Sequence, residues 1–276
     1  MLAAIALTPT APVLIPELAG TAAAEVDELR TAAIAAAGSL PQRWIGVGVG
    51  PADERVGPES RGTFAGYGAD VPVAFSAEAS PLITDLPLCA LFGAWLRGQA
   101  NPEAVMQLRV YSADHDGSTA VALGGRLRAE IEDIAEPVGV LVLADGATAL
   151  TPSAPSGYDD AAVAAQIELD TALALGDVAA LAHLPASIAG RVAYQVLAGL
   201  AEAGTWDATE LGRGAPYGVG YFAGVWRPAG RSEATGELGP AGRSEATGGL
   251  GPAGRSEATG GLGPAGRSEA TGGLGS

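Results

Sequence analysis

Residues 138–144 read Val-Gly-Val-Leu-Val-Leu-Ala, and the polar pair Asp145-Gly146 follows at once. An unbroken apolar run that ends in an acidic residue and a glycine is typical of a strand buried on both faces of a sheet. Such strands belong to parallel sheets whose two faces are covered by helices. This stretch therefore predicts an α/β fold.

Similar β-type runs alternate with helical stretches along the rest of the chain. The strands we expect are Leu2–Leu7, Trp44–Val49, Val71–Phe75, Gln107–Tyr111, Val138–Ala144 and Val219–Val225. The helices we expect are Ala22–Ala36, Leu82–Arg97, Thr119–Ile134, Asp160–Leu175 and Ile188–Glu202, with Thr21 and Ser187 as start signals. The prediction is a single α/β domain over residues 1–227, with a mostly parallel central sheet covered by helices on both faces. Ligands of such sheets bind beyond the carboxyl ends of the strands, which directs attention to the loops after Leu7, Val49 and Leu143.

A repeat occupies the end of the chain. From Pro228 the unit Pro-Ala-Gly-Arg-Ser-Glu-Ala-Thr-Gly-Gly-Leu-Gly recurs, with Glu237 as an internal departure. Each unit has a single Leu, too little apolar surface to offset the roughly 1–2 kcal/mol per residue that ordering a backbone costs. We therefore expect a disordered tail over residues 228–276, and a role as a tether or partner motif is the alternative.

The composition excludes several classes of function. All 15 basic residues are Arg, they face 31 acidic residues, and the formal charge is −16, with no basic cluster for a nucleic acid to bind. The absence of Lys excludes Schiff-base and Walker-type chemistry. No apolar stretch approaches the ~20 residues of a membrane span, and Pro9 and Pro12 interrupt the apolar start, so we expect a cytoplasmic protein. Cys89 is typical of a buried small hydrophobic residue.

Local motifs give little chemistry. The glycines of residues 46–50 lack the third glycine and the helix of a dinucleotide loop, because Pro51 follows. Asp114-His115-Asp116 is a compact cluster of metal-type residues, but neighbouring side chains on an extended segment point apart, so a solvated turn is the competing interpretation. His183 is typical of a partly packed residue at a helix end. No Gly-x-Ser-x-Gly elbow is present.

Three segments carry a family resemblance. Residues 9–18 read Pro-Thr-Ala-Pro-Val-Leu-Ile-Pro-Glu-Leu, residues 144–159 read Ala-Asp-Gly-Ala-Thr-Ala-Leu-Thr-Pro-Ser-Ala-Pro-Ser-Gly-Tyr-Asp, and residues 214–221 read Gly-Ala-Pro-Tyr-Gly-Val-Gly-Tyr. These resemble, in order, Pro-His-Pro-Pro-x-Leu-x-Pro-Glu-Val, Gly-Asp-Leu-Ser-His-Arg-Leu-Thr-Pro-x-Ala-Pro-x-Gly-Tyr-Asp and Glu-Ala-Pro-Phe-Gly-Val-Gly-Tyr of the class III extradiol ring-cleavage dioxygenase-like superfamily, which includes the Memo-like proteins. The resemblance spans nearly all of residues 1–227 and extends to a group of actinobacterial, alanine-rich proteins.

The resemblance implies an Fe(II) enzyme from which this sequence departs. In the family, two histidines and a glutamate hold the iron, a further histidine handles protons, and open positions remain for a catechol-type substrate and O₂. Here the two histidine ligands fall on Thr10 and Ala52, the glutamate on Gly214 and the proton-handling histidine on Thr148. Because Ala and Gly have no donor side chain, the comparison predicts a degenerate member that lacks the iron ligands and has no cofactor.

The candidate pocket consists of these positions and their neighbours. Its candidate residues are Thr10, Glu17, Ala52, Asp53, Asp145, Thr148 and Tyr217. Carboxylates of this set, together with Glu54, could form an oxygen-rich site for Mg²⁺ or Ca²⁺, whereas Glu17 and Asp145 are also typical of turn or helix caps. A further Asp-His-Gly motif of the family would fall on Asp85-Leu86-Pro87.

Three functions follow as hypotheses. The first is a non-catalytic protein that binds an unknown small molecule or a protein partner through the former iron pocket. The second is a metal-dependent oxidoreductase, a ring-cleavage dioxygenase whose Fe(II) site is rebuilt on Asp114, His115 and Asp116. The third is a structural component of a larger assembly, such as a homo-oligomer, which exposed apolar surface on Trp95, Trp206 or Trp226 would favour.

Overall fold

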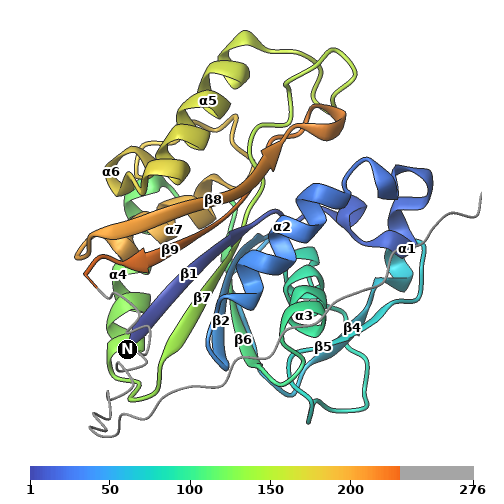
Figure 1. The fold of residues 1–276 in the computed structure, drawn as a ribbon, viewed down its shortest axis with the longest axis vertical. Helices are drawn as coiled ribbons and strands as arrows, with labels where there is room; N and C mark the ends of the chain where they lie inside the picture. Colours follow the sequence, from blue (N-terminus) through green and yellow to red (C-terminus); the bar gives the residue numbers. More distant parts are fainter. Residues whose placement is uncertain (231–276) are drawn as a thin grey trace, which may run out of the picture. The chain divides into compact units, whose positions relative to one another are not determined.

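The computed structural model describes residues 1–230 and confirms the α/β fold (Figure 1). A seven-stranded central sheet has the strand order β3-β6-β2-β7-β1-β9-β8. Its strands are β1 (Leu2–Thr8), β2 (Arg43–Gly50), β3 (Glu54–Val56), β6 (Val105–Ser112), β7 (Val138–Leu143), β8 (Trp206–Gly214) and β9 (Tyr221–Pro228). The repeat tail predicted for residues 228–276 starts at the last residue of β9, and from residue 231 onward it lies outside the described residues.

The middle of the sheet is parallel and its flanks are antiparallel. Strands β6, β2, β7 and β1 run parallel to one another, whereas β3 pairs antiparallel with β6, β9 with β1, and β8 with β9. Strand β9 cannot be parallel to β8, because residues 215–220 are too few for the crossover that a parallel pair needs. The strand predicted at Val71–Phe75 is outside the central sheet: β5 (Pro72–Ala74) pairs with β4 (Arg61–Thr63) in a separate two-stranded sheet.

Helices cover both faces of the central sheet (Figure 1). One face is covered by α2 (Asp27–Gly38) and α3 (Leu88–Ala100), and the other by α4 (Gly117–Glu132), α5 (Asp160–Leu175), α6 (Val178–Leu181) and α7 (Arg191–Ala201). The short α1 (Pro16–Ala19) precedes α2. Each face encloses its own apolar core, with Phe92 and Leu96 of α3 in one, and Leu127 and Ile131 of α4 in the other.

The predicted helix starts are only partly right. Helix α5 has the predicted bounds, and Asp159 caps it by accepting a hydrogen bond from the Ala161 N–H. Thr21 and Ser187 are wrong as start signals, because α2 begins at Asp27 and α7 at Arg191. The helix predicted from Leu82 begins at Leu88 instead, since Pro87 is extended and precedes the first helical turn.

Glycines bring α4 and α7 into direct backbone contact. A Cβ atom on Gly124 of α4 would lie 2.0 Å from the Val196 carbonyl oxygen, and one on Gly199 of α7 would lie 1.9 Å from the Val121 carbonyl oxygen. Neither helix can therefore carry a larger residue at this crossing without moving apart. The contact fixes the position of α4 against α7 on this face of the sheet.

The tryptophans are mostly internal. Trp95 and Trp226 are buried, and the partly exposed Trp206 ring lies 6.3 Å, centroid to centroid, from that of Trp226. Of the three tryptophans whose exposure would favour a role in a larger assembly, only Trp206 is therefore partly exposed. No helix in this part of the chain has both the length and the apolar character to cross a membrane.

Candidate functional site

A crevice lies over the carboxyl ends of the central strands. The connections that follow β1 and β2 lead to the face covered by α2 and α3. Strand β7 lies between β1 and β2, and the connection that follows it leads to the opposite face, covered by α5 and α7. Connections that diverge in this way leave a depression at the strand ends, where ligands of open α/β sheets bind. A cavity of about 230 Å³ is present there, lined by Thr10, Val49, Leu88, Cys89, Leu143, Ala144, Asp145, Ala189 and Gly190.

Hydrogen bonds join the three family-like segments beside this crevice, and Thr10, Ala144 and Asp145 of the first two segments line its cavity. The Thr10 N–H donates to Asp145 Oδ1 at 2.7 Å, which joins residues 9–18 to residues 144–159. The Gly146 N–H donates to the Gly220 carbonyl, and the Gly220 N–H donates to the Ala147 carbonyl, both at 2.8 Å. Segments far apart in the sequence therefore form one continuous wall.

Glycine is required at two positions of this wall. A Cβ atom on Gly146 would lie 2.1 Å from Gln166 Oε1, and one on Gly220 would lie 2.2 Å from the same atom. Gln166 cannot easily move, because it is buried, accepts from the Ala147 N–H at 2.7 Å and donates to Asp170 at 2.8 Å. Its role was missed at the sequence level, where a polar residue inside a predicted helix gives no sign of which loop it supports.

Asp145 and Thr10 supply the polar groups of the cavity. Burial raises the pKa of the Asp145 carboxyl to about 6, and the hydrogen bond from Thr10 opposes that rise. The residue keeps partial exposure through the cavity. The Thr10 hydroxyl is buried and has no hydrogen-bond partner within residues 1–230. A buried hydroxyl without a partner is unfavourable unless water or a ligand completes it.

The remaining groups around the cavity are structural. Burial raises the pKa of the Cys89 thiol to about 12, so the thiol stays protonated and acts as a small apolar residue, as predicted. The buried Tyr194 hydroxyl donates to the Ala144 carbonyl at 2.9 Å, and the Gly190 N–H donates to the Asp145 carbonyl at 2.8 Å. Helix α7 thus fixes the backbone that carries Asp145.

A second cavity adjoins the first. It measures about 720 Å³ and shares Val49 and Leu88 with the 230 Å³ cavity, which we call the Thr10 cavity. Its other lining residues are Gly50, Pro51, Glu54, Tyr67, Asp85, Leu86, Pro87 and Ala113. Residues 85–87 therefore line this crevice, and Ala52 follows the lining residue Pro51 at its exposed rim.

The structure does not bring all pocket candidates together. The Thr148 hydroxyl lies 2.8 Å from the Ser156 hydroxyl, and Gly214 ends β8 as an exposed residue. Glu17 lines a different cavity beside Trp95 and Arg97. Tyr217, which has a left-handed backbone with φ of 59°, donates its hydroxyl to Glu25 at 2.7 Å. Thr10 and Asp145 are the candidates that share a cavity.

The cluster of residues 114–116 is divided. His115 Nε2 lies 2.7 Å from Asp53 Oδ1, which also accepts from the Ser112 N–H at 2.7 Å. The Ser112 hydrogen bond, together with His115, lowers the pKa of Asp53. Asp116 instead caps α4 by accepting from the Thr119 N–H. Because Asp116 is engaged elsewhere, this geometry does not favour the metal site hypothesised on Asp114, His115 and Asp116.

The side chains do not fit the iron site that the resemblance implies. Ala52 and Gly214 offer no donor atom, and Thr10 offers a neutral hydroxyl in place of an imidazole. In the part of the chain that the structure describes, no group of three or more His, Cys, Asp or Glu side chains is placed to hold a metal ion. No reaction step through iron follows from this arrangement.

Comparison with solved structures identifies a protein of similar fold. No family model matches the sequence, and no curated protein matches it either. The fold is similar to the crystal structure of an uncharacterized protein, JW3007, from Escherichia coli K12, with a TM-score of 0.52 and 12% sequence identity over 82% of this chain and 99% of that one. At this identity the similarity describes the arrangement of helices and strands alone.

Proposed function

We propose that this protein binds a small molecule in the crevice over β1, β7 and β2, on the scaffold of the class III extradiol dioxygenase-like superfamily and without its iron. The observation that carries the proposal is the Thr10 cavity. There a carboxyl group and a hydroxyl that has no hydrogen-bond partner among residues 1–230 lie together among apolar walls. A few convergent polar groups in an apolar cavity are typical of ligand sites.

The convergence of the three family-like segments supports the scaffold. Residues 9–18, 144–159 and 214–221 lie apart in the sequence but meet at one edge of the sheet. Gly220, which the third segment shares with the family pattern, is a position where a Cβ atom would collide with Gln166. At Gly220 the shared pattern thus corresponds to packing beside the crevice, and at Asp145 to the carboxyl group of the cavity.

The cavity favours a ligand with a hydrogen-bond donor. Val49, Leu88 and Leu143 form apolar walls, and both polar groups of the cavity can accept a hydrogen bond. With a pKa of about 6, Asp145 is mostly ionised at neutral pH, and an ionised acceptor binds a hydroxyl or ammonium donor more strongly than a neutral one. A small ring that carries hydroxyl groups matches these features.

Catechol is a suitable probe, and ligand-observed NMR measures its binding. We expect catechol to bind the metal-free wild-type protein, and Asp145→Asn to weaken binding about tenfold, the loss expected for a hydrogen bond to a charged group. Glu17→Gln is the matched control, because Glu17 lines a different cavity and should leave binding unchanged.

Elemental analysis of the protein purified from its own host tests the second half of the proposal. We expect no stoichiometric iron. Iron retained at one equivalent and lost in Asp145→Asn would overturn the proposal, and so would catechol binding that is the same in Asp145→Asn and the wild type.

A further inference from the structure

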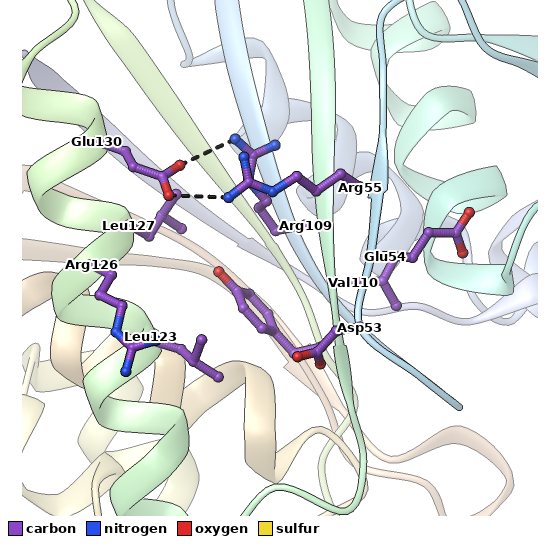
Figure 2. A pocket seen from close by; sticks show the side chains of 10 residues that line it. Asp53, Glu54, Arg55, Arg109, Val110, Leu123, Arg126, Leu127 and Glu130 are labelled. Carbon is purple, nitrogen blue, oxygen red and sulfur yellow. Dashed lines mark hydrogen bonds and ion pairs between the residues drawn. The ribbon is translucent and has the colours of Figure 1, made fainter.

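A further polar cavity, separate from the two cavities of the crevice, lies between α4 and the strands β3 and β6. It measures about 320 Å³ and is lined by Asp53, Glu54, Arg55, Arg109, Val110, Tyr111, Leu123, Arg126, Leu127 and Glu130. Figure 2 shows Arg55 and Arg109 directed toward Glu130, with Arg126 on the same helix as Glu130. We call this the arginine cavity.

Two of its arginines oppose each other across a strand pair. Arg55 of β3 and Arg109 of β6 are partners in the antiparallel register, and like charges in that relation repel. One carboxylate offsets them both: Glu130 Oε1 lies 3.2 Å from Arg55 Nη2, and Oε2 lies 3.3 Å from Arg109 Nη2. A single negative charge therefore faces two guanidinium groups.

Arg109 is buried and incompletely paired. The residue is 9% exposed, and its Nη1 donates to Gln107 Oε1 at 3.3 Å. Its Nε–H has no hydrogen-bond partner in the described chain. A buried charge is costly unless its donors are satisfied, so an additional acceptor is expected beside this guanidinium.

Arg126 adds a third positive charge to the same cavity. It precedes Glu130 by one helical turn, yet no hydrogen bond or ion pair joins it to any side chain of residues 1–230. Asp53 is already engaged by His115 and Ser112, and Glu54 points away from the arginine pair in Figure 2. The arginines thus exceed the carboxylate that pairs with them, in a chain whose formal charge is −16.

We propose that the arginine cavity binds a small ligand through an oxyanion group, either a phosphate or a carboxylate. Guanidinium groups present planar pairs of N–H donors that match the oxygens of such groups. An oxyanion held by Arg126 beside the Arg55–Arg109 pair would offset the positive charge that Glu130 alone leaves. This site lies on the α4 face of the sheet and does not depend on the crevice function.

Isothermal titration with inorganic phosphate, and separately with succinate, tests the proposal at low ionic strength. We expect saturable binding of at least one of the two anions at millimolar concentration or below, and the tighter one identifies the oxyanion class. Arg126→Ala should weaken binding at least about fivefold, because it removes one charge-assisted contact. Arg43→Ala is the control, since it removes the same charge from an exposed pair with Glu136.

Arg109→Lys provides a second variant that keeps the charge but loses the planar fork, and it should weaken binding without unfolding the protein. Thermal unfolding of each variant verifies that the fold is kept. The proposal is overturned if neither anion binds the wild type, or if Arg126→Ala and Arg109→Lys bind as the wild type does.

Discussion

The crevice and the arginine cavity both adjoin the central sheet, but different interactions determine their shapes. The crevice is shaped by backbone hydrogen bonds and by glycines packed against Gln166, and Asp145 is the carboxyl group of its inner cavity. The arginine cavity is shaped by charged side chains that β3, β6 and α4 bring together. The first should therefore respond to side-chain volume and to pH, and the second to charge and to salt.

The largest expected effect is steric and belongs to the crevice. Gly220→Ala places a Cβ atom 2.2 Å from Gln166 Oε1, so either Gln166 loses its hydrogen bond from Ala147 or the wall moves. We expect a loss of about 3 kcal/mol in the free energy of unfolding, measured by urea denaturation, from overpacking and a lost buried hydrogen bond.

Gly214→Ala is the matched control for that variant. Gly214 is exposed, and an added Cβ atom would meet only Pro216 Cδ, at 3.7 Å. Its stability should change by less than about 0.5 kcal/mol, as for most surface substitutions. Equal losses for the two variants would contradict the view that glycine supports the crevice wall at Gly220.

The next effect is the pH response of Asp145. Because its folded pKa of about 6 lies above the ordinary value of about 3.9, the folded state binds the proton more tightly than the unfolded state does. The resulting stabilisation is complete below about pH 4 and is lost as the pH rises through about 6. Asp145→Asn does not titrate, so its stability relative to the wild type should rise by about 2 kcal/mol between about pH 4.5 and about pH 8.

Urea denaturation of both proteins at the two pH values measures this difference, and other carboxylates cancel in the comparison. A difference that does not vary with pH would show that the carboxyl group is solvated in the folded state, which would weaken the crevice as a site with a poised acceptor.

The fold was largely predictable because strand runs such as residues 138–144 are continuous and apolar. Local patterns identify strands buried on both faces and helices such as α5. They did not predict β8, whose exposed polar residues carry no alternation of core positions, or the antiparallel direction of β9, which depends on a short loop. Helices α2, α3 and α7 begin without a side-chain cap, so cap residues could not predict where they start.

The sites were predictable only where a motif marked them. Thr10 and Asp145 were candidates because they stand within family-like segments, and they do share a cavity. The contact of Gln166 with Ala147 joins residues that are 19 positions apart in the sequence, and that of Asp53 with His115 joins residues 62 positions apart. A single sequence does not reveal such contacts. The arginine cavity went unrecognised because Arg55, Arg109 and Arg126 come together only through strand pairing and the position of α4.

The smallest expected effect is electrostatic and belongs to the arginine cavity. Glu130→Gln keeps the side-chain shape but leaves Arg55 and Arg109 opposed without a charge between them. Since the Glu130 side chain is exposed, we expect a loss of only about 1 kcal/mol in the free energy of unfolding. The loss should shrink as salt screens the arginines, and millimolar phosphate should reverse it more than the same ionic strength of chloride does.

Glu136→Gln, which breaks an exposed pair with Arg43, is the control that should show no phosphate effect. A Glu130→Gln protein indifferent to both salt and phosphate would mean that the arginines are held by packing, and the contrast with the crevice would disappear.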